Sequence, residues 1–138
     1  MTDPAYYVQK AVHGRLIANA ALTTMVPAAN MVDDYGGVPT RFPCILVGEA
    51  QVVDEGHDIA RTVNRVYLTL HLWTAEPRLT MVKKIAGALR AALGGPRLTL
   101  EGGYHLADLY IVDTRYIRDP SGANGHGVVT INALVGRS

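Results

Sequence analysis

The segment from Val66 to Trp73 constrains the fold more than any other part of this chain, because its side chains alternate strictly in character. Its even-numbered positions are aliphatic and its odd-numbered positions are aromatic or polar: Val66, Leu68, Leu70 and Leu72 against Tyr67, Thr69, His71 and Trp73. A strict period of two is typical of a β-strand with one buried face. The protein therefore contains a sheet, and other elements must cover one face of it.

A long amphipathic helix is predicted directly after this strand, from about Ala75 to Leu93. Thr74 is a suitable N-cap, and the Gly94-Gly95-Pro96 run ends the segment. The larger apolar side chains fall in one sector of the helix, which predicts a single buried stripe formed by Leu79, Val82, Ile85, Ala86, Leu89 and Leu93.

The opposite side of this helix consists mainly of small residues, with Lys84, Gly87, Ala88 and Ala91 at helical spacing. Alanine is a good helix former, so a solvent-exposed face is one interpretation. Small side chains also let another backbone approach closely, so a packing surface for a neighbouring subunit is the other. The sequence leaves both interpretations open.

The N-terminal segment predicts a first helix. Asp3 is an N-cap before Pro4, and the helix is expected to run to about Ala21. It is apolar on two sides, with Val8, Val12 and Leu16 on one and Tyr7, Ala11, Gly14 and Ala18 on the other. A helix of this kind is usually packed between two partners. One further helical turn is expected before Pro27, and residues 30–40 are expected to form a loop.

Three further strands are expected from apolar runs bounded by turn residues. They cover Phe42 to Val47, about His105 to Ile117, and about Val128 to Val135. An exposed loop or hairpin tip is expected from Gln51 to Arg61, and the turn-rich segment from Arg118 to Gly127 predicts a second hairpin with a long tip. The expected fold class is α+β, with a mostly antiparallel sheet and two long helices packed on one face.

Composition is that of one globular domain spanning residues 1–138. Of its residues, 49% are hydrophobic and 18% are charged, whereas about a quarter are charged in an average domain. Together with the two-sided first helix, this low charge indicates a surface partly buried in an assembly. The net charge of +1 does not suit a protein that grips nucleic acid by bulk charge. Neither a signal peptide nor a membrane span is visible, so assembly in the cytoplasm is expected.

Residue types that carry chemistry are present, but not in reactive patterns. The five histidines never occur at metal-ligand spacing, and Cys44, the sole cysteine, lies in an apolar run that suits a core thiol. Ser121, His126 and Asp119 share one glycine-rich turn, which does not hold a catalytic triad in place. We therefore expect no metal site, no cofactor and no enzymatic activity.

Three tyrosines, Tyr104, Tyr110 and Tyr116, lie at even offsets on one predicted strand near Arg118. This arrangement suits either a platform for nucleic-acid bases or ordinary packing on a sheet face, and the lack of surplus basic charge favours packing. Two rival classes stay open. A small enzyme needs a converging polar pocket, and a neutral nucleic-acid adaptor shows salt-dependent duplex binding.

Three stretches, read in order, resemble the tail completion or tail terminator family of long-tailed phages and gene transfer agents. The first is Phe42-Pro43-Cys44-Ile45-Leu46-Val47-Gly48-Glu49, a hydrophobic strand between Phe-Pro and Gly-Glu. The second is Tyr67-Leu68-Thr69-Leu70-His71-Leu72-Trp73, a strand that closes on an aromatic residue before the long helix. The third is Tyr116-Ile117-Arg118-Asp119-Pro120-Ser121-Gly122 followed by His126-Gly127-Val128-Val129. The similarity extends over nearly the whole chain.

The resemblance implies a structural virion protein that assembles as a ring, expected to be a hexamer, on the head-proximal end of the tail tube. There it is expected to stop tube polymerisation and join the tail to the head connector. Its expected partners are further copies of itself, the tail tube protein and the connector or stopper protein, with DNA passing through the lumen without sequence-specific binding. The alternative within this class is a head-side stopper or adaptor ring. The source stays open among a phage, a prophage and a gene transfer agent.

A closed ring requires two different buried faces on each subunit. We expect the surface formed by Lys84, Gly87, Ala88 and Ala91 to serve one such contact. The two polar tips are expected to contact neighbouring rings, through Asp54, Glu55, His57, Asp58, Arg61, Arg118, Asp119 and His126.

Overall fold

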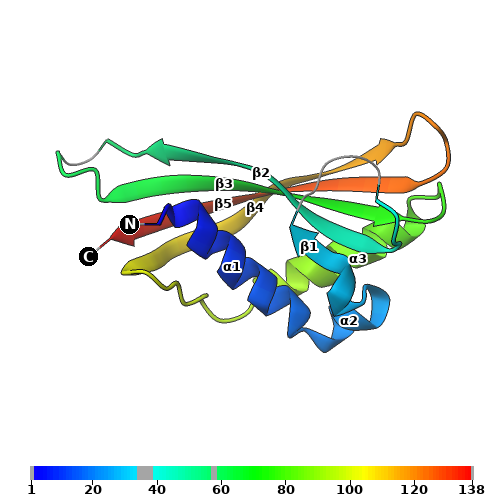
Figure 1. The fold of residues 1–138 in the computed structure, drawn as a ribbon, viewed down its shortest axis with the longest axis horizontal. Helices are drawn as coiled ribbons and strands as arrows, with labels where there is room; N and C mark the ends of the chain where they lie inside the picture. The colour runs from blue at the N-terminus through cyan, green and yellow to red at the C-terminus, as the bar shows by residue number, and fades with distance from the viewer. Residues whose placement is uncertain (1, 34–38, 57–58, 138) are drawn as a thin grey trace.

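The computed structural model describes residues 2–33, 39–56 and 59–137. Its helices are α1 (Pro4–Ile17), α2 (Ala20–Met25) and α3 (Thr80–Leu93), with a 3-10 turn η1 (Ala28–Asn30). Its strands are β1 (Met31–Asp33), β2 (Cys44–Asp54), β3 (Val63–Thr74), β4 (Tyr104–Arg118) and β5 (Gly125–Arg137). The long strands run along the length of the molecule, and the helices pack against them (Figure 1).

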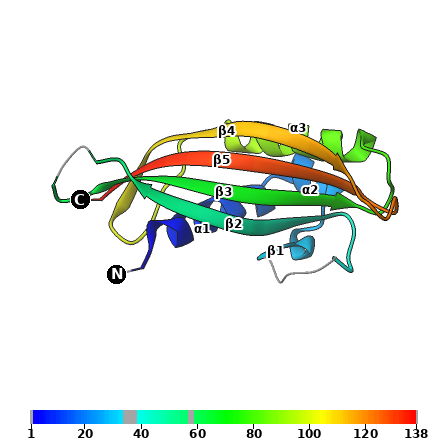
Figure 2. The same cartoon turned by 90° about the horizontal axis from the view of Figure 1, so that it is seen from above.

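The five strands form one sheet in the order β1-β2-β3-β5-β4. The pairs β2 with β3, β3 with β5 and β5 with β4 are antiparallel, and only the short β1 pairs in parallel with β2. Seen from above, the helices lie behind the strands, so the described helices cover one face of the sheet (Figure 2). The predicted α+β class, with two long helices on one face of a mostly antiparallel sheet, is confirmed.

The core lies between the sheet and the helices. On β3, Val66, Leu68, Leu70 and Leu72 are 0% exposed, as their alternation predicted. The helices bury their own apolar stripes against them: Val8, Val12 and Leu16 from α1, and Val82, Ile85, Ala86, Leu89 and Ala92 from α3. Each larger side chain contributes about 1.5–3 kcal/mol when buried, so this layer supplies most of the hydrophobic stabilisation.

Helix α1 was predicted to pack between two partners, and it is fully covered on one apolar side and only partly covered on the other. Tyr7 packs against Tyr104, with ring centroids 5.6 Å apart, and Ala11 is half-buried. Gly14 and Ala18, further along the same side, are exposed. The second apolar side of α1 is therefore covered near its start and open near its end.

Strand β2 is longer than predicted. The turn signal at Gly48 and Glu49 is a β-bulge, which shifts the register with β3 between Val47 and Ala50 and lets the strand continue to Asp54. Gly48 is required there, because a Cβ atom at this position would lie 2.8 Å from the His71 ring. The tip predicted from Gln51 onward is correspondingly shorter.

Both predicted helices differ at one boundary. The first ends at Ile17 because the Asn19 side chain accepts a hydrogen bond from the Leu22 amide at 2.9 Å and so starts α2 as a new helix. Thr74 is not the cap of the second helix, since it is the last residue of β3 and its hydroxyl donates to the Glu76 carbonyl. Helix α3 begins only at Thr80.

Part of the segment predicted as a loop before Phe42 is a strand. Residues 31–33 form β1, which is held next to β2 by three paired positions and is too short to show a periodic pattern. Asn30, just before it, donates from its amide to the Pro43 carbonyl at 3.0 Å. Residues 34–38 of the predicted loop lie outside the described residues.

Candidate functional site

The outer surface of α3 is open in this chain. Lys84, Gly87 and Ala91 are exposed, and among the described residues no atom other than those of the adjoining helix backbone lies within 4 Å of the position that a Cβ atom would take on Gly87. Ala88, at the margin of this surface, is half-buried and packs against the core. The predicted small-residue surface thus exists as a continuous exposed strip on α3, with Ala88 forming its border.

The hairpin tip between β2 and β3 carries three of the predicted contact residues. Asp54 accepts a hydrogen bond of 2.5 Å from the Asn64 amide, and Arg61 has a left-handed backbone with φ of 54°. Glu55 pairs with Arg65 and is therefore turned toward the sheet. His57 and Asp58, also predicted here, lie outside the described residues.

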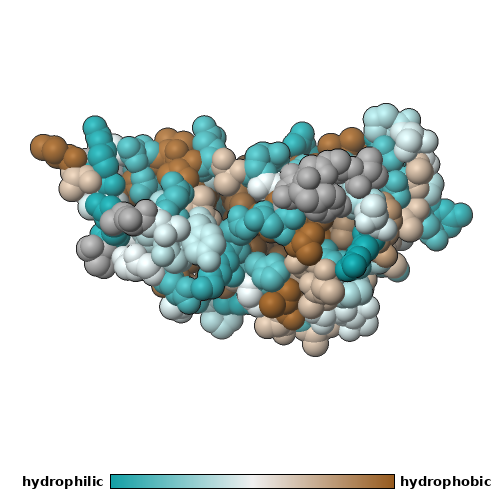
Figure 3. All heavy atoms as spheres, viewed as in Figure 1, coloured by the Kyte–Doolittle hydropathy of each residue, from teal (hydrophilic) through white to brown (hydrophobic). Residues whose placement is uncertain are grey.

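The same tip presents a residue that the sequence analysis did not single out. Ile59 is 98% exposed, whereas no other large hydrophobic side chain of the described residues exceeds 50%. An isolated apolar residue within a run of charged and small residues was the available signal. Elsewhere on the face shown in Figure 3, apolar side chains occur in small separate groups among hydrophilic ones.

The hairpin tip between β4 and β5 is organised by Asp119. Its carboxylate accepts hydrogen bonds from the Ser121 hydroxyl at 2.6 Å and from the Ser121 amide at 3.3 Å. These hydrogen bonds lower the pKa of Asp119. Arg118 ends β4 beside it and is exposed. The Ser121 hydroxyl is thus engaged by Asp119, which is the geometry of a turn rather than of a nucleophile directed at a base.

The two tips lie at opposite ends of the molecule (Figures 1 and 2). Strand β3 starts with Val63 paired to Gly136 near one tip and ends with Thr74 paired to Gly125 near the other. A strand of 12 residues spans about 40 Å. The structure therefore brings Asp54, Glu55 and Arg61 together at one end, and Arg118 and Asp119 together at the other.

His126 belongs to the sheet and not to the tip, because β5 already begins at Gly125. Its ring stacks on Trp73, with centroids 3.9 Å apart and planes 9° apart. Its Nε2 lies 3.0 Å from Nδ1 of His71, whose Nε2 in turn lies 3.3 Å from the Glu49 carboxylate. Burial, and next the neighbouring His71, lower the pKa of His126.

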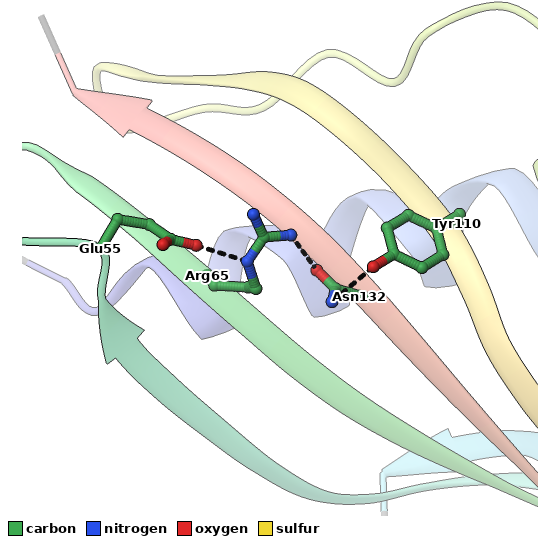
Figure 4. A network of polar contacts seen from close by, with 4 residues as sticks. All are labelled: Glu55, Arg65, Tyr110 and Asn132. Carbon is green, nitrogen blue, oxygen red and sulfur yellow. Dashed lines mark hydrogen bonds and ion pairs between the residues drawn. The ribbon is translucent and has the colours of Figure 1, made fainter. Parts of the chain in front are cut away.

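A second polar group crosses the face of the sheet that the described helices leave uncovered (Figure 4). Arg65 pairs with Glu55 and also donates to the Asn132 side chain at 2.8 Å. Asn132 in turn donates to the Tyr110 hydroxyl at 3.1 Å. These four residues link β3, β5 and β4 to the end of β2, and Asn132 is only 3% exposed. The only signal in the sequence was a single amide in the apolar run of β5.

The predicted row of three tyrosines does not form. Two β-bulges in β4, between Leu106 and Asp108 and between Ile111 and Asp113, each reverse the side to which later side chains point. Tyr104 is buried beneath the sheet and Tyr116 lies under the Lys83 ammonium of α3, whereas Tyr110 is on the other face beside Asn132. The equal spacing in the sequence therefore does not produce a stacking platform.

Two further expectations concern reactive groups. The Cys44 thiol is 2% exposed, and burial raises its pKa to about 11, so it is a poor nucleophile at neutral pH. Within residues 2–33, 39–56 and 59–137, no three His, Cys, Asp or Glu side chains are grouped as a metal site would require. None of the helices formed by these residues has the length and hydrophobicity needed to cross a lipid bilayer.

Comparison with known proteins agrees with this architecture. The fold is similar to that of a chain in the virion of a native gene transfer agent particle, with a TM-score of 0.79, 23% identity and 96% of each chain covered. It is also similar to that of bacteriophage SPP1 gp17 protein, with a TM-score of 0.59, 20% identity, and 94% of this chain and 89% of that chain covered. No curated protein sequence matches significantly.

The decisive finding is a match to a family model. The model of the family described as Tail completion protein gp17 matches residues 10–136, from the middle of α1 to the end of β5. This match confirms the resemblance seen in the three sequence stretches. The chain therefore belongs to the tail completion protein gp17 family and is a tail protein of a virion.

Proposed function

We propose that this protein is a tail terminator: a ring of six copies on the head-proximal end of the tail tube that stops tube polymerisation and joins the tail to the head connector. DNA passes through the lumen of this ring without sequence-specific binding. The proposed role is structural, in keeping with the family of tail completion proteins. The proposed partners are the tail tube protein on one side and the connector or stopper protein on the other.

The observation that carries this proposal is the position of the two hairpin tips at opposite ends of an elongated subunit (Figure 1). A ring that lies between a tube and a connector needs contact surfaces at both of its ends. In the proposed ring, the β2–β3 tip with Asp54, Glu55, Arg61 and the exposed Ile59 meets one neighbour. The β4–β5 tip with Arg118 and Asp119 meets the other.

The lateral contact of the proposed ring uses the outer surface of α3. Gly87 and Ala91 allow the backbone of a neighbouring copy to approach, and Lys84 lies at the edge of the strip. A closed ring buries two different faces of each subunit, so α3 supplies only one half of the contact. The net charge of +1 is compatible with a ring that lets DNA move through it.

Electron microscopy of the purified protein, alone and after addition of tail-tube subunits, tests this function. Rings that cap the tube ends and limit tube length are the expected result. Free tubes that keep growing in the presence of the protein would contradict it. In the producing cell, loss of the protein is expected to leave overlong tails without heads. DNA-filled heads that leak their contents would instead indicate the head-side stopper role.

A substitution on α3 tests the lateral contact. Ala88→Arg is the most direct change, but the half-buried Ala88 also packs against the core, so the exposed Ala91 is the sharper position. Ala91→Arg is expected to abolish rings while leaving a folded monomer by circular dichroism. Ala21→Arg, at an exposed alanine of α2, is the matched control and is expected to keep the rings.

A further inference from the structure

Opposite charges are segregated along this chain although its net charge is close to zero. Residues 31–64 contain six acidic residues and two basic ones, whereas residues 75–97 contain five basic residues and one acidic one. The first segment includes β1 and β2, and the second contains α3. An even mixture of both signs is usual on the surface of a soluble domain, so this separation needs an explanation.

The two segments lie along opposite edges of the sheet (Figure 2). Strands β1 and β2 are at one end of the strand order, and β4 is at the other. Helix α3 lies along the β4 edge, because Arg90 donates to the Thr114 hydroxyl at 3.4 Å and the Lys83 ammonium lies 5.5 Å from the Tyr116 ring centroid. The described residues therefore place Asp33 and Glu49 on one edge and Lys83, Lys84 and Arg90 on the other, beside β4, which carries two acidic and two basic residues of its own.

The charged side chains at both edges are available for contacts. Lys83, Lys84 and Arg90 on α3 are exposed. On the other edge, the Glu49 side chain is 73% exposed and interacts only weakly, at 3.3 Å, with His71. Strand β1 pairs with β2 only from Ile45 to Val47, so the described residues put no strand beside β2 at Glu49.

Glu49 on one edge and Arg90 on the other also lie at nearly the same position along the strand direction. Through the sheet, Val47 pairs with Leu70, Leu70 with Val129, and Val129 with Thr114. Glu49 follows Val47 in the bulge, and Arg90 contacts Thr114. Glu49 and Arg90 therefore stand at nearly the same level on opposite edges of one subunit.

In the proposed ring, on which this inference rests, the equal position of Glu49 and Arg90 lets neighbouring copies bring these two residues together. If the two tips face the neighbouring rings, the ring axis runs along the strands. Rotation about that axis keeps the height of every residue, so the Glu49 edge of one copy meets the Arg90 edge of the next at the same level. We infer that the acidic β1–β2 edge of a second copy of this chain is the surface that docks against α3, with Glu49 facing Arg90.

Charge reversal tests this pairing. Arg90→Glu and Glu49→Arg are each expected to raise the protein concentration needed for ring assembly at least about tenfold, because like charges then face each other at every contact. The double variant carries a reversed pair at each contact and is expected to recover assembly close to that of the unchanged protein. Lys10→Glu makes the same change of charge on α1, at a side chain that is 53% exposed and belongs to none of the proposed contacts, and is the matched control, expected to leave ring assembly unaffected. Circular dichroism and thermal unfolding of each variant verify that it is folded.

The outcomes separate this inference from the proposed function. If single reversals leave assembly unchanged, or if the double variant assembles no better than the singles, the pairing of the two edges is wrong while the ring still stands. If the unchanged protein forms no rings, alone or with tail-tube subunits, the ring itself is wrong. Weaker assembly at raised salt concentration in the unchanged protein is a further expected result, since exposed charges are screened.

Discussion

The two faces of the sheet are built in different ways. The face covered by α1 and α3 is apolar throughout its centre, with Leu68, Leu70 and Ile131 all 0% exposed. The other face carries the four-residue polar group around Asn132 and the stack of His126 on Trp73 and beside His71. Both faces belong to the same strands and are separated only by the alternation of side chains.

The two faces differ in what they contribute: the apolar face mainly to the free energy of folding, and the polar face mainly to the geometry of contacts between strands. Burial of apolar side chains is non-directional and supplies most of the free energy of folding. A polar group on the open face contributes less, but its partners have to be in fixed positions to satisfy each other. The covered face therefore supplies most of the stability, and the polar group on the open face adds directional contacts between β3, β5, β4 and the end of β2.

The largest expected effect is on the covered face. Leu70→Ala removes a fully buried side chain between the sheet and the helices and is expected to lower the free energy of unfolding by about 2–5 kcal/mol. Urea denaturation measures this change. Thr69→Ala, at the adjacent position on the open face, is the control and is expected to cost less than about 1 kcal/mol. Equal losses at both positions would show that the two faces do not differ in this way.

A smaller loss is expected at the centre of the polar group. Asn132→Ala removes the acceptor of Arg65 and the donor to Tyr110, and is expected to lower the free energy of unfolding by about 1–3 kcal/mol. Tyr110→Phe removes only one of these hydrogen bonds and is expected to cost about 0.5–1.5 kcal/mol. A Tyr110→Phe loss as large as that of Asn132→Ala would contradict the central position of Asn132.

The smallest expected effect is a change in the free energy of unfolding with pH, which arises from His126. The pKa of His126 is lowered in the folded protein, so the unfolded chain binds a proton more readily. Its contribution to stability is complete above the ordinary histidine pKa of 6.5 and is lost as the pH falls below that value toward the lowered pKa. The urea midpoint is therefore expected to decrease between about pH 7.5 and pH 5.5.

His126→Gln isolates this contribution, because it removes the titrating ring and is expected to flatten the pH dependence in that range. The pKa of Asp119 is also lowered, but it affects stability only below about pH 4, outside this window. A variant with the same slope as the unchanged protein would show that another group is responsible.

The elements with strong local patterns were predictable from the sequence, and their boundaries were not. The alternation around Leu70 and the apolar stripe of α3 follow from side-chain spacing alone. The end of α1 at Ile17 depends on the single hydrogen bond of the Asn19 cap, and the bulge after Val47 depends on register with a distant strand. The start of α3 at Thr80 has no side-chain cap that the sequence could have shown. Local propensity carries little information about such contacts.

The candidate contact surfaces were likewise predictable where they follow a periodic pattern and not where they depend on distant contacts. The exposed strip on α3 was predictable, because helical periodicity assigns Gly87 and Ala91 to the side opposite the buried stripe. The assignment of His126 to a tip was wrong, because its place in β5 is set by pairing with Trp73 across the sheet. Ile59 was missed because a single apolar residue has no periodicity.

The fold class, the β4–β5 hairpin, the buried stripes and the family could be inferred from patterns that lie within short segments of the sequence. Which side chains meet across strands, on which face each tyrosine lies, and that the acidic and basic segments lie on opposite edges became clear only from the folded chain. Strand order and register are set by contacts between residues far apart in the chain, which short segments do not reveal. A single β-bulge reverses the face of the sheet to which the following side chains point, and no local pattern in the sequence predicts it.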